Sequence, residues 1–391
     1  MTNRWRVLAL LFCVRVTMAF QFQAVAALSP LLMDRFGVGL ADIGLLIGLY
    51  LSPGIIIALP GGAIGRRFGD KRAVAFGMVL MLAGGLVMAL VPGWQAQITG
   101  RVLAGIGGCI LNVLMTKMVT DWFTGCELAT AMGIFVNSWP VGIAGALLVL
   151  PSLAGMFGLS ATLGLIAGFV AIGLALLVVY YRPPARTVSG VATPASPLRG
   201  AALVCVLLAG SIWGLYNSAL GMIFGFGPAM LVEQGWSASA ASSTTSIVLW
   251  IVSLSVPLGG LMADRLRQRD SVLAFGVLSF AALMLATPGA NQVFLMFIAL
   301  GIVSGIAAGP IMSLPADVLL AGNRAHGMGL FYTLFYLAIF AAPIVAGRVA
   351  EAAGGAEAAF YFGGWLLLGC LPLLGLFKVS ARQTGAVVAT A

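Results

Sequence analysis

The sequence predicts an all-α membrane protein with twelve transmembrane helices, arranged as two pseudo-symmetric bundles of six. Hydrophobic residues make up 61% of the chain and charged residues only 8%, which leaves too little polar surface to keep soluble domains dissolved. Apolar segments of about 20 residues, enough to span a hydrocarbon core, recur throughout. The basic residues are concentrated in every second loop between these segments. Together these observations predict a polytopic membrane protein.

Each helix is placed on one apolar segment, and the loops between them carry the charged and turn-forming residues. Six segments precede the only extended Pro- and Ser-rich stretch of the chain, and six follow it. The predicted helices are 6–28, 42–64, 72–92, 97–120, 128–151, 158–181, 201–225, 241–263, 271–288, 292–318, 326–349 and 358–378.

The basic residues also predict the orientation. Of the twenty Lys and Arg residues, only Arg35 and Arg348 fall on the side opposite to most of the others. Positive loops resist translocation, so we expect both termini to be cytoplasmic in an inner membrane. Arg15 interrupts the first apolar run and no small-residue cleavage site follows, which predicts a retained helix. The net charge of +9 is spread over short loops, which argues against nucleic acid as a partner.

An internal repeat relates the two halves. At an offset of 198 residues, glycines, prolines and one arginine coincide without a gap, at turn and close-packing positions. We therefore expect an N-terminal bundle over 1–181, a cytoplasmic linker over 182–200 and a C-terminal bundle over 201–391. The coincident pairs are Pro30 with Pro228, Gly37 with Gly235, Gly61 with Gly259, Gly62 with Gly260 and Arg67 with Arg265.

Two loops carry a family signature. Residues 61–72 read GGAIGRRFGDKR and residues 259–267 read GGLMADRLR. They resemble the loop signature of the major facilitator superfamily, in which paired glycines precede an Asp-Arg, a glycine and further basic residues. The second copy keeps Asp264 and Arg265, whereas the first has Arg66, followed by Arg67, where the acid is expected. The resemblance implies gating roles for Arg67, Asp264 and Arg265.

Further segments extend this resemblance over nearly the whole chain. Arg101 with the glycines that follow it is similar to the embedded arginine of the family's fourth helix, and the sequence NSWPVG at 137–142 loosely resembles its fifth-helix motif. Membership implies solute transport by alternating access, with helices 1, 4, 7 and 10 lining a central cavity. It also implies that Arg101 serves coupling or braces helix 1, and we expect Asp34 or Asp42 as its partner when the outer side is closed.

A narrower resemblance concerns residues 115–145, which look most like permeases of the cyanate and nitrate/nitrite-related branch. Nitrate carriers of that branch have embedded arginines in helices 2 and 8. This chain has no basic residue between Asp42 and Gly65 or between Ala241 and Ala263, so nitrate itself is disfavoured.

Arg15 is the strongest candidate for contact with a solute. A charge near the bilayer midplane costs several kcal/mol unless it faces a wet cavity or a partner. A planar guanidinium suits a carboxylate or a similar oxyanion. The alternative is a structural arginine that binds backbone carbonyls of a broken helix.

Other candidates lie at similar depth. The 198-residue offset maps Arg15 onto Trp213, and Tyr216 and Asn217 share its helix face. The same offset places Asn137 opposite the segment that carries Tyr332 and Tyr336. All six are expected solute contacts, and the alternative for each is a packing or lipid-facing role.

The acidic residues lie in loops or near helix ends, and none is placed securely at mid-membrane. Asp317 is the nearest candidate for coupling, with Arg324 as its expected partner, and Lys117 and Asp121 are expected to form a helix-end ion pair. Missing embedded carboxylates favour a carrier of a small anion over a proton-driven exporter of cations.

We therefore expect a monomeric secondary transporter of a small anionic solute, acting as exchanger, uniporter or proton-anion symporter, with no cofactor and no metal. The alternatives are a non-transporting receptor on the same fold and an exporter of a neutral or amphipathic compound. An intramembrane enzyme is not expected, since no catalytic constellation occurs at mid-depth.

Overall fold

The computed structural model describes residues 4–58, 65, 67–123, 128–183, 198–319 and 324–383. The described chain is helical. Its elements are α1 (Arg4–Ala27), α2 (Ser29–Phe36), α3 (Leu40–Leu49), α4 (Gly54–Ile57), α6 (Asp70–Leu90), α7 (Trp94–Phe123), α8 (Leu128–Val136), α9 (Ser138–Phe157), α10 (Leu159–Tyr180), α11 (Gly200–Glu233), α12 (Ala238–Leu266), α13 (Arg269–Ala286), α14 (Val293–Val303), α15 (Ala308–Ser313), the 3-10 helix η1 (Leu314–Asp317), α16 (Arg324–Ala353) and α17 (Glu357–Gln383).

Within the described residues, twelve helical spans are long and apolar enough to cross a membrane, which confirms the predicted all-α architecture. One boundary was wrong by a full two turns. The seventh span was expected to end at 225, before Pro228, yet α11 continues through that proline to Glu233. It stops at Gly235 (φ +90°), where the Gly235 amide bonds to the Val232 carbonyl and the Trp236 amide to the Leu231 carbonyl. This Schellman arrangement is the true end signal.

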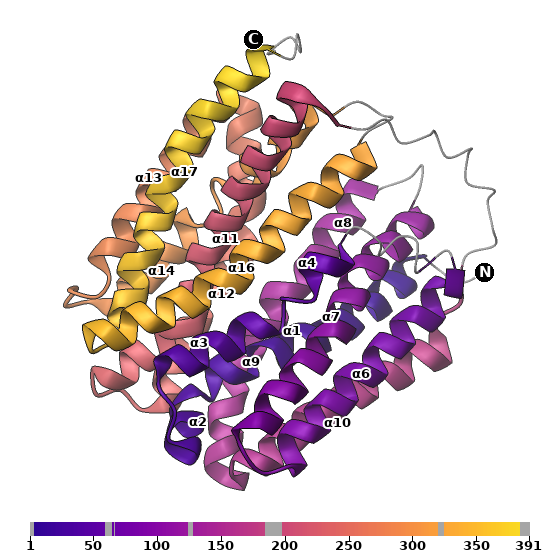
Figure 1. Cartoon of the computed structure of the whole chain (residues 1–391), viewed down its shortest axis with the longest axis vertical. Coiled ribbons are helices and arrows are strands. Elements are labelled where there is room, and N and C mark those ends of the chain that lie inside the picture. The colour runs from indigo at the N-terminus through magenta and orange to yellow at the C-terminus, as the bar shows by residue number, and fades with distance from the viewer. Residues whose placement is uncertain are drawn as a thin grey trace.

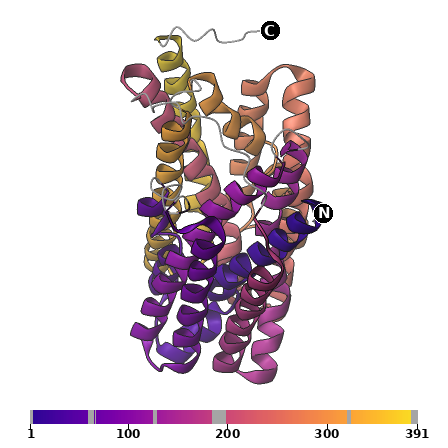
Figure 2. The ribbon, with the colours of Figure 1, turned by 90° about the vertical axis from the view of Figure 1, so that its right-hand side faces the viewer.

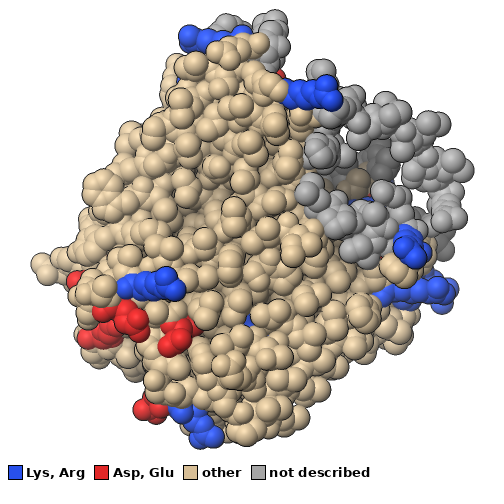
Figure 3. Space-filling view, in the orientation of Figure 1, with Lys and Arg blue, Asp and Glu red and all other residues tan. Residues whose placement is uncertain are grey.

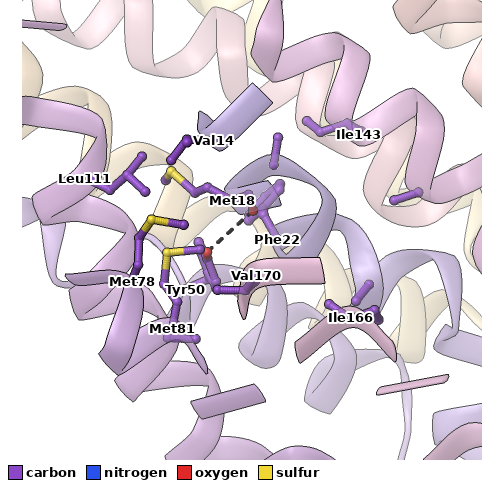
Figure 4. Packing of buried hydrophobic residues seen from close by; sticks show 14 of the residues in the cluster. Val14, Met18, Phe22, Tyr50, Met78, Met81, Leu111, Ile143, Ile166 and Val170 are labelled. Carbon is purple, nitrogen blue, oxygen red and sulfur yellow. Dashed lines mark hydrogen bonds between the residues drawn. The ribbon is translucent and has the colours of Figure 1, made fainter. Parts of the chain in front are cut away.

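The helices gather into two groups that follow the chain (Figures 1 and 2). In the first, α1 packs on α9 and α10, and α6 packs on α7 and α10. In the second, α11 packs on α16 and α17. Figure 4 shows part of the first core, where Met18, Met78 and Met81 lie around Tyr50, whose hydroxyl donates to the Met18 carbonyl at 3.5 Å. The boundaries of the linker, 182–200, stay a prediction because residues 184–197 lie outside the described ranges.

The two groups meet along seams of small residues. Helix α3 packs on α16, and α9 packs on α12. A Cβ atom added to Gly44 would overlap the Pro343 carbonyl, and one added to Gly347 would overlap the Leu40 carbonyl, so only glycine permits this approach. These positions belong to the ends of α3 and α16 that lie away from the chain termini.

Charge separates the two ends of the molecule. An even number of spans brings both chain termini to one end, and Figure 3 shows an uncharged belt between charged ends, with acidic side chains gathered at the end opposite the termini. This distribution agrees with the predicted topology. Assignment of the terminal end to the cytoplasm remains a prediction.

Candidate functional site

A cavity of about 970 Å³ lies between the two helix groups. Its lining comes from α1, α3, α7, α8 and α9 on one side and from α11, α12, α15 and α16 on the other. All seven residues predicted as solute contacts are part of this lining: Arg15, Asn137, Trp213, Tyr216, Asn217, Tyr332 and Tyr336. The depth argument and the internal repeat therefore selected residues of one common surface from four segments distant in sequence: α1, the junction of α8 and α9, α11 and α16.

Arg15 lies at the middle of α1 and is held by the junction between α8 and α9. Its Nη1 donates to the carbonyl oxygens of Phe135 (3.1 Å) and Val136 (3.5 Å) and to the Ser138 hydroxyl (3.3 Å). The guanidinium carbon lies 4.7 Å from the centre of the Phe135 ring, a cation-π contact. Nη2 donates to Oδ1 of Asn112 at 2.9 Å.

One of the carbonyls that bind Arg15, that of Val136, is available because of a proline, while the Phe135 carbonyl also accepts from the Ser138 hydroxyl. Pro140 has no N–H, so the Val136 carbonyl lacks the helical donor four residues ahead. The chain turns at Asn137 between α8 and α9, and the guanidinium supplies the missing donors. The predicted alternative, an arginine bonded to carbonyls of a broken helix, is therefore observed. Yet the side chain also lines the cavity, and its buried Nε has no hydrogen-bond partner.

Sequence reasoning missed Asn112, which connects Arg15 to the other helix group. The Asn112 amide nitrogen donates to the Tyr336 hydroxyl at 2.8 Å, while its amide oxygen accepts from Arg15. Asn112 lines the cavity from α7, and Tyr336 reaches it from α16. An amide inside the apolar stretch of α7 between Arg101 and Thr116 was the available signal, because such a group needs partners inside a membrane.

Aromatic side chains form the facing wall. The Trp213 ring lies 6.0 Å from Tyr216 and 6.2 Å from Phe335, with interplanar angles of 18° and 24°. Trp213 and Phe335 are half-buried, whereas Tyr216 is buried against Phe280 and its hydroxyl has no hydrogen-bond partner. Tyr216 therefore belongs to the wall through its ring. We refer to Trp213, Tyr216, Tyr332, Phe335 and Tyr336 as the aromatic wall.

The end of the cavity that lies away from the chain termini is closed by a second group of rings. The centre of the Phe22 ring lies 5.1 Å from that of Trp139 in the same helix group. It lies 6.2 Å from the centre of the Phe224 ring, which belongs to the other group. The Gln23 side chain donates to the Phe224 carbonyl at 2.6 Å. From this floor the cavity extends past Arg15 toward the other end, where Thr116, Met132 and Met328 line it.

Arg101 lies outside the cavity lining and is 1% exposed. The expectation of a carboxylate partner, Asp34 or Asp42, was wrong. Its nitrogens donate to the carbonyls of Leu46 (2.8 Å), Gln21 (3.1 Å) and Phe22 (2.6 Å). Three carbonyls satisfy a buried guanidinium and tie α1 and α3 to α7. The bracing role implied for helix 1 is what this geometry provides.

Of the predicted gating residues, Asp317 pairs with both terminal nitrogens of Arg269 (2.9 and 2.6 Å). Its expected pairing with Arg324 stays a prediction, because the Arg324 side chain lies outside the described residues. Arg67 and Arg265 are exposed, and the Asp264 side chain is likewise not described, nor are Arg66, Gly61 and Gly62.

The ion pair between Lys117 and Asp121 is confirmed at 2.8 Å, and Lys117 also pairs with Asp70 at 2.6 Å. Asp70 begins α6, so this cation joins α6 to α7. The cluster lies on the side of the molecule that carries the chain termini, away from the cavity.

The formal charge of the cavity lining is positive. Among its described lining residues Arg15 carries the only formal charge, and no Asp or Glu is present. The arrangement provides one fixed positive charge, an aromatic wall and a closed floor. A cavity with such a lining is suited to binding a small solute.

Known proteins share this sequence pattern and this fold. The model of the Major Facilitator Superfamily matches residues 11–227 and 202–390. The hexuronate transporter of Bacillus subtilis is 23% identical over 92% of this chain and 91% of its own length, and the 2-nitroimidazole transporter of Escherichia coli is 24% identical over 90% of each. The crystal structure of a D-xylose-proton symporter, 15% identical, superposes with a TM-score of 0.77 over 94% of this chain and 97% of its own. With two family matches that together cover nearly the whole chain, and with its twelve spans around a central cavity, this protein belongs to the Major Facilitator Superfamily and is a secondary transporter, not an enzyme.

Proposed function

We propose that this protein carries a small organic anion across the inner membrane by alternating access, with both termini in the cytoplasm and one chain as the working unit. The anion binds in the central cavity against Arg15. Asn137, Trp213, Tyr216, Asn217, Tyr332 and Tyr336 complete the contact surface.

The observation that carries the proposal is the isolated charge of Arg15. A guanidinium at mid-membrane is costly, and the carbonyls of Phe135 and Val136 together with Asn112 offset that cost through hydrogen bonds, not through a negative charge. The net positive charge of the cavity wall thus remains uncompensated among the described lining residues. An anion that enters supplies the missing charge.

The seams support alternating access. The outer floor at Phe22 and Phe224 is closed and α3 packs tightly on α16, whereas the cavity extends toward the opposite end. Such a shape corresponds to one of the two states of a rocking carrier. With the termini in the cytoplasm, this state faces inward.

The mode of energy coupling follows from the same lining. No described residue of the cavity is a carboxylic acid that would carry a proton. We therefore favour exchange, uniport or symport in which the proton travels with the anion. Asp317 is bound to Arg269, and Arg67, Asp264 and Arg265 are proposed to act at the gate and not in the cavity.

The relatives suggest two chemical classes of solute. One is named for hexuronates, which are anions, and another for 2-nitroimidazole, an aromatic compound. The second makes export of a neutral or amphipathic compound the alternative function. The narrower likeness of residues 115–145 to cyanate and nitrate-related permeases stays a prediction, and a receptor that does not transport is the other alternative.

The test begins with thermal unfolding of the purified protein in the presence of acetate, benzoate, D-glucuronate and benzamide. We expect at least one carboxylate to stabilise the wild type and to lose this effect in Arg15→Gln. Arg35→Gln, which removes the same charge from a partly exposed surface position, is the matched control and keeps the effect. Arg15→Lys retains the charge and serves if the Gln variant is unstable; its stabilisation should be weakened but present.

Transport is measured separately by counterflow of the stabilising, radiolabelled carboxylate into proteoliposomes. Counterflow by the wild type and its loss in Arg15→Gln support the carrier. Stabilisation without counterflow favours the receptor. A carboxylate effect that is unchanged in both Arg15 variants, or stabilisation by benzamide alone, contradicts the anion proposal.

A further inference from the structure

We infer that the cavity selects monocarboxylates with a flat aromatic body over polyhydroxylated sugar acids and over dicarboxylates. This inference rests on the proposed transport of an organic anion and specifies its substrate class. The observations that carry it are the number of charges, the state of the polar side chains and the geometry of the aromatic wall.

The charge of the cavity matches one negative charge. Arg15 is the only charged side chain among the described lining residues, and both of its terminal nitrogens already donate to Phe135, Val136, Ser138 or Asn112. A second carboxylate on the solute would be desolvated without a counter-charge, which is strongly unfavourable in an apolar site. Dicarboxylates are therefore disfavoured.

Several polar side chains of the lining already have partners in the protein, whereas the Tyr216 and Ser218 hydroxyls have none. Thr116 donates to the Asn112 carbonyl, Asn217 to the Trp213 carbonyl and Ser304 to the Gly301 carbonyl. Both ends of the Asn112 amide are used by Arg15 and Tyr336. A sugar acid with several hydroxyl groups would lose water on entry and find Asn112, Thr116 and Ser304 already bonded within the protein, which costs binding energy for each hydroxyl left unpaired.

The aromatic wall offers ring faces to a flat solute. Trp213 and Phe335 are half-buried, with their planes inclined by only 24°, and Tyr332 is 37% exposed. Aromatic rings pack on such faces with about 0.5–1.5 kcal/mol beyond the area they bury. Phe22 and Trp139 line the same cavity at its floor, so a ring finds aromatic surface on more than one side.

The positive charge and the wall lie next to each other. Arg15 bonds to Asn112, Asn112 bonds to Tyr336, and the Tyr336 ring lies 5.3 Å from Phe335, which in turn lies beside Trp213. One amide and one tyrosine thus separate the guanidinium from the stacked rings. A solute that carries both a carboxylate and an aromatic ring can therefore meet the charge and the wall within one cavity.

The experiment measures binding to the full-length protein in nanodiscs by isothermal titration, with benzoate, phenylacetate, D-glucuronate, terephthalate and benzamide as probes. We expect benzoate or phenylacetate to bind at least about tenfold more tightly than D-glucuronate, terephthalate and benzamide. Trp213→Leu should weaken the aromatic carboxylate by about three- to tenfold and leave acetate unchanged, since only the ring contact is lost. Trp213→Phe should restore most of the affinity.

Trp365→Leu is the matched control, because Trp365 is 66% exposed on the outer surface of α17 and should not affect binding. Tighter binding of D-glucuronate that depends on Arg15 would overturn this inference and leave the proposed anion transport intact. Benzamide binding equal to that of benzoate, insensitive to Arg15→Gln, would overturn both. Failure of benzoate and phenylacetate to bind at millimolar concentration would also refute the aromatic class.

Discussion

The closed seam between α3 and α16 depends on glycine, and Gly44→Ala tests that dependence. A methyl group at this position would overlap the carbonyl of Pro343 on the facing helix. The α16 backbone at Pro343 thus leaves no room for a side chain at position 44 of α3. Because the overlap is with backbone and not with the end of a flexible side chain, the seam must separate to accommodate it.

The magnitude follows from the cost of overpacking. Inserting a methyl group into a well-packed contact costs about 1–3 kcal/mol. If this cost falls on the closed state alone, the equilibrium between closed and open seams shifts by about 5- to 150-fold toward the open one. Opening at this end is the motion that alternating access requires.

The assay uses spin labels on cysteines introduced at Ser152 and Ser239, whose hydroxyl oxygens lie 3.2 Å apart across the α9–α12 seam. Cys13 and Cys126 are replaced by Ser so that only the introduced cysteines are labelled. Pulsed electron resonance should show short distances in the wild type and a larger population of long distances in Gly44→Ala. Gly164→Ala is the control, because a methyl group there meets no atom within 4 Å.

An unchanged distance distribution in Gly44→Ala, with correctly folded protein, would refute the reasoning. It would mean that the helices accommodate the methyl group locally and that glycine does not control closure. An equal shift in Gly164→Ala would point to a general effect of alanine on helix stability and would equally contradict the argument.

Three further changes probe other contacts. Arg101→Leu should lower the stability against thermal unfolding by at least about 3 kcal/mol, since three carbonyls lose a charged donor; an unchanged melting temperature would contradict its bracing role. Tyr336→Phe leaves the Asn112 amide nitrogen without its partner and should raise the open fraction in the spin-label measurement by the equivalent of about 0.5–1.5 kcal/mol; no rise would show that this bond does not join the halves. Asp317→Asn should change the melting point little, because its pair with Arg269 is about one-third exposed and worth about 1 kcal/mol or less; a large loss would contradict this and show that the pair holds η1 against α13.

Much of the architecture was accessible from the sequence because a bilayer imposes strong and simple constraints. Segment length and hydropathy predicted the twelve spans, and the 198-residue repeat pointed from Arg15 to Trp213, which lines the same cavity. The end of α11 was missed because Pro228 suggested a break, whereas the backbone of Gly235 supplies the real one. Local composition alone did not distinguish a tolerated proline from a terminating glycine.

The partners of the two embedded arginines were less accessible. Charge reasoning assigned Arg101 a carboxylate, but the buried carbonyls of three residues near helix breaks satisfy it. For Arg15, one partner is the Val136 carbonyl, which has no helical donor because Pro140 lies four residues after Val136. Both residues are far from Arg15 in the sequence. Such pairings depend on how helices cross, which neither hydropathy nor spacing encodes. The same applies to Asn112, whose partners come from two other helices.

Because Arg15 both bonds the α8–α9 junction and lines the cavity, it restricts which substitutions the cavity can accept during evolution. One guanidinium completes the junction at Pro140 and also lines the central cavity, so replacing it would remove donors from that junction as well as a charge from the cavity. Adaptation to new solutes should therefore proceed by exchanging aromatic rings of the cavity wall, at Trp213 and Phe335. Descendants that retain the proline should also retain the arginine, whatever they have come to transport.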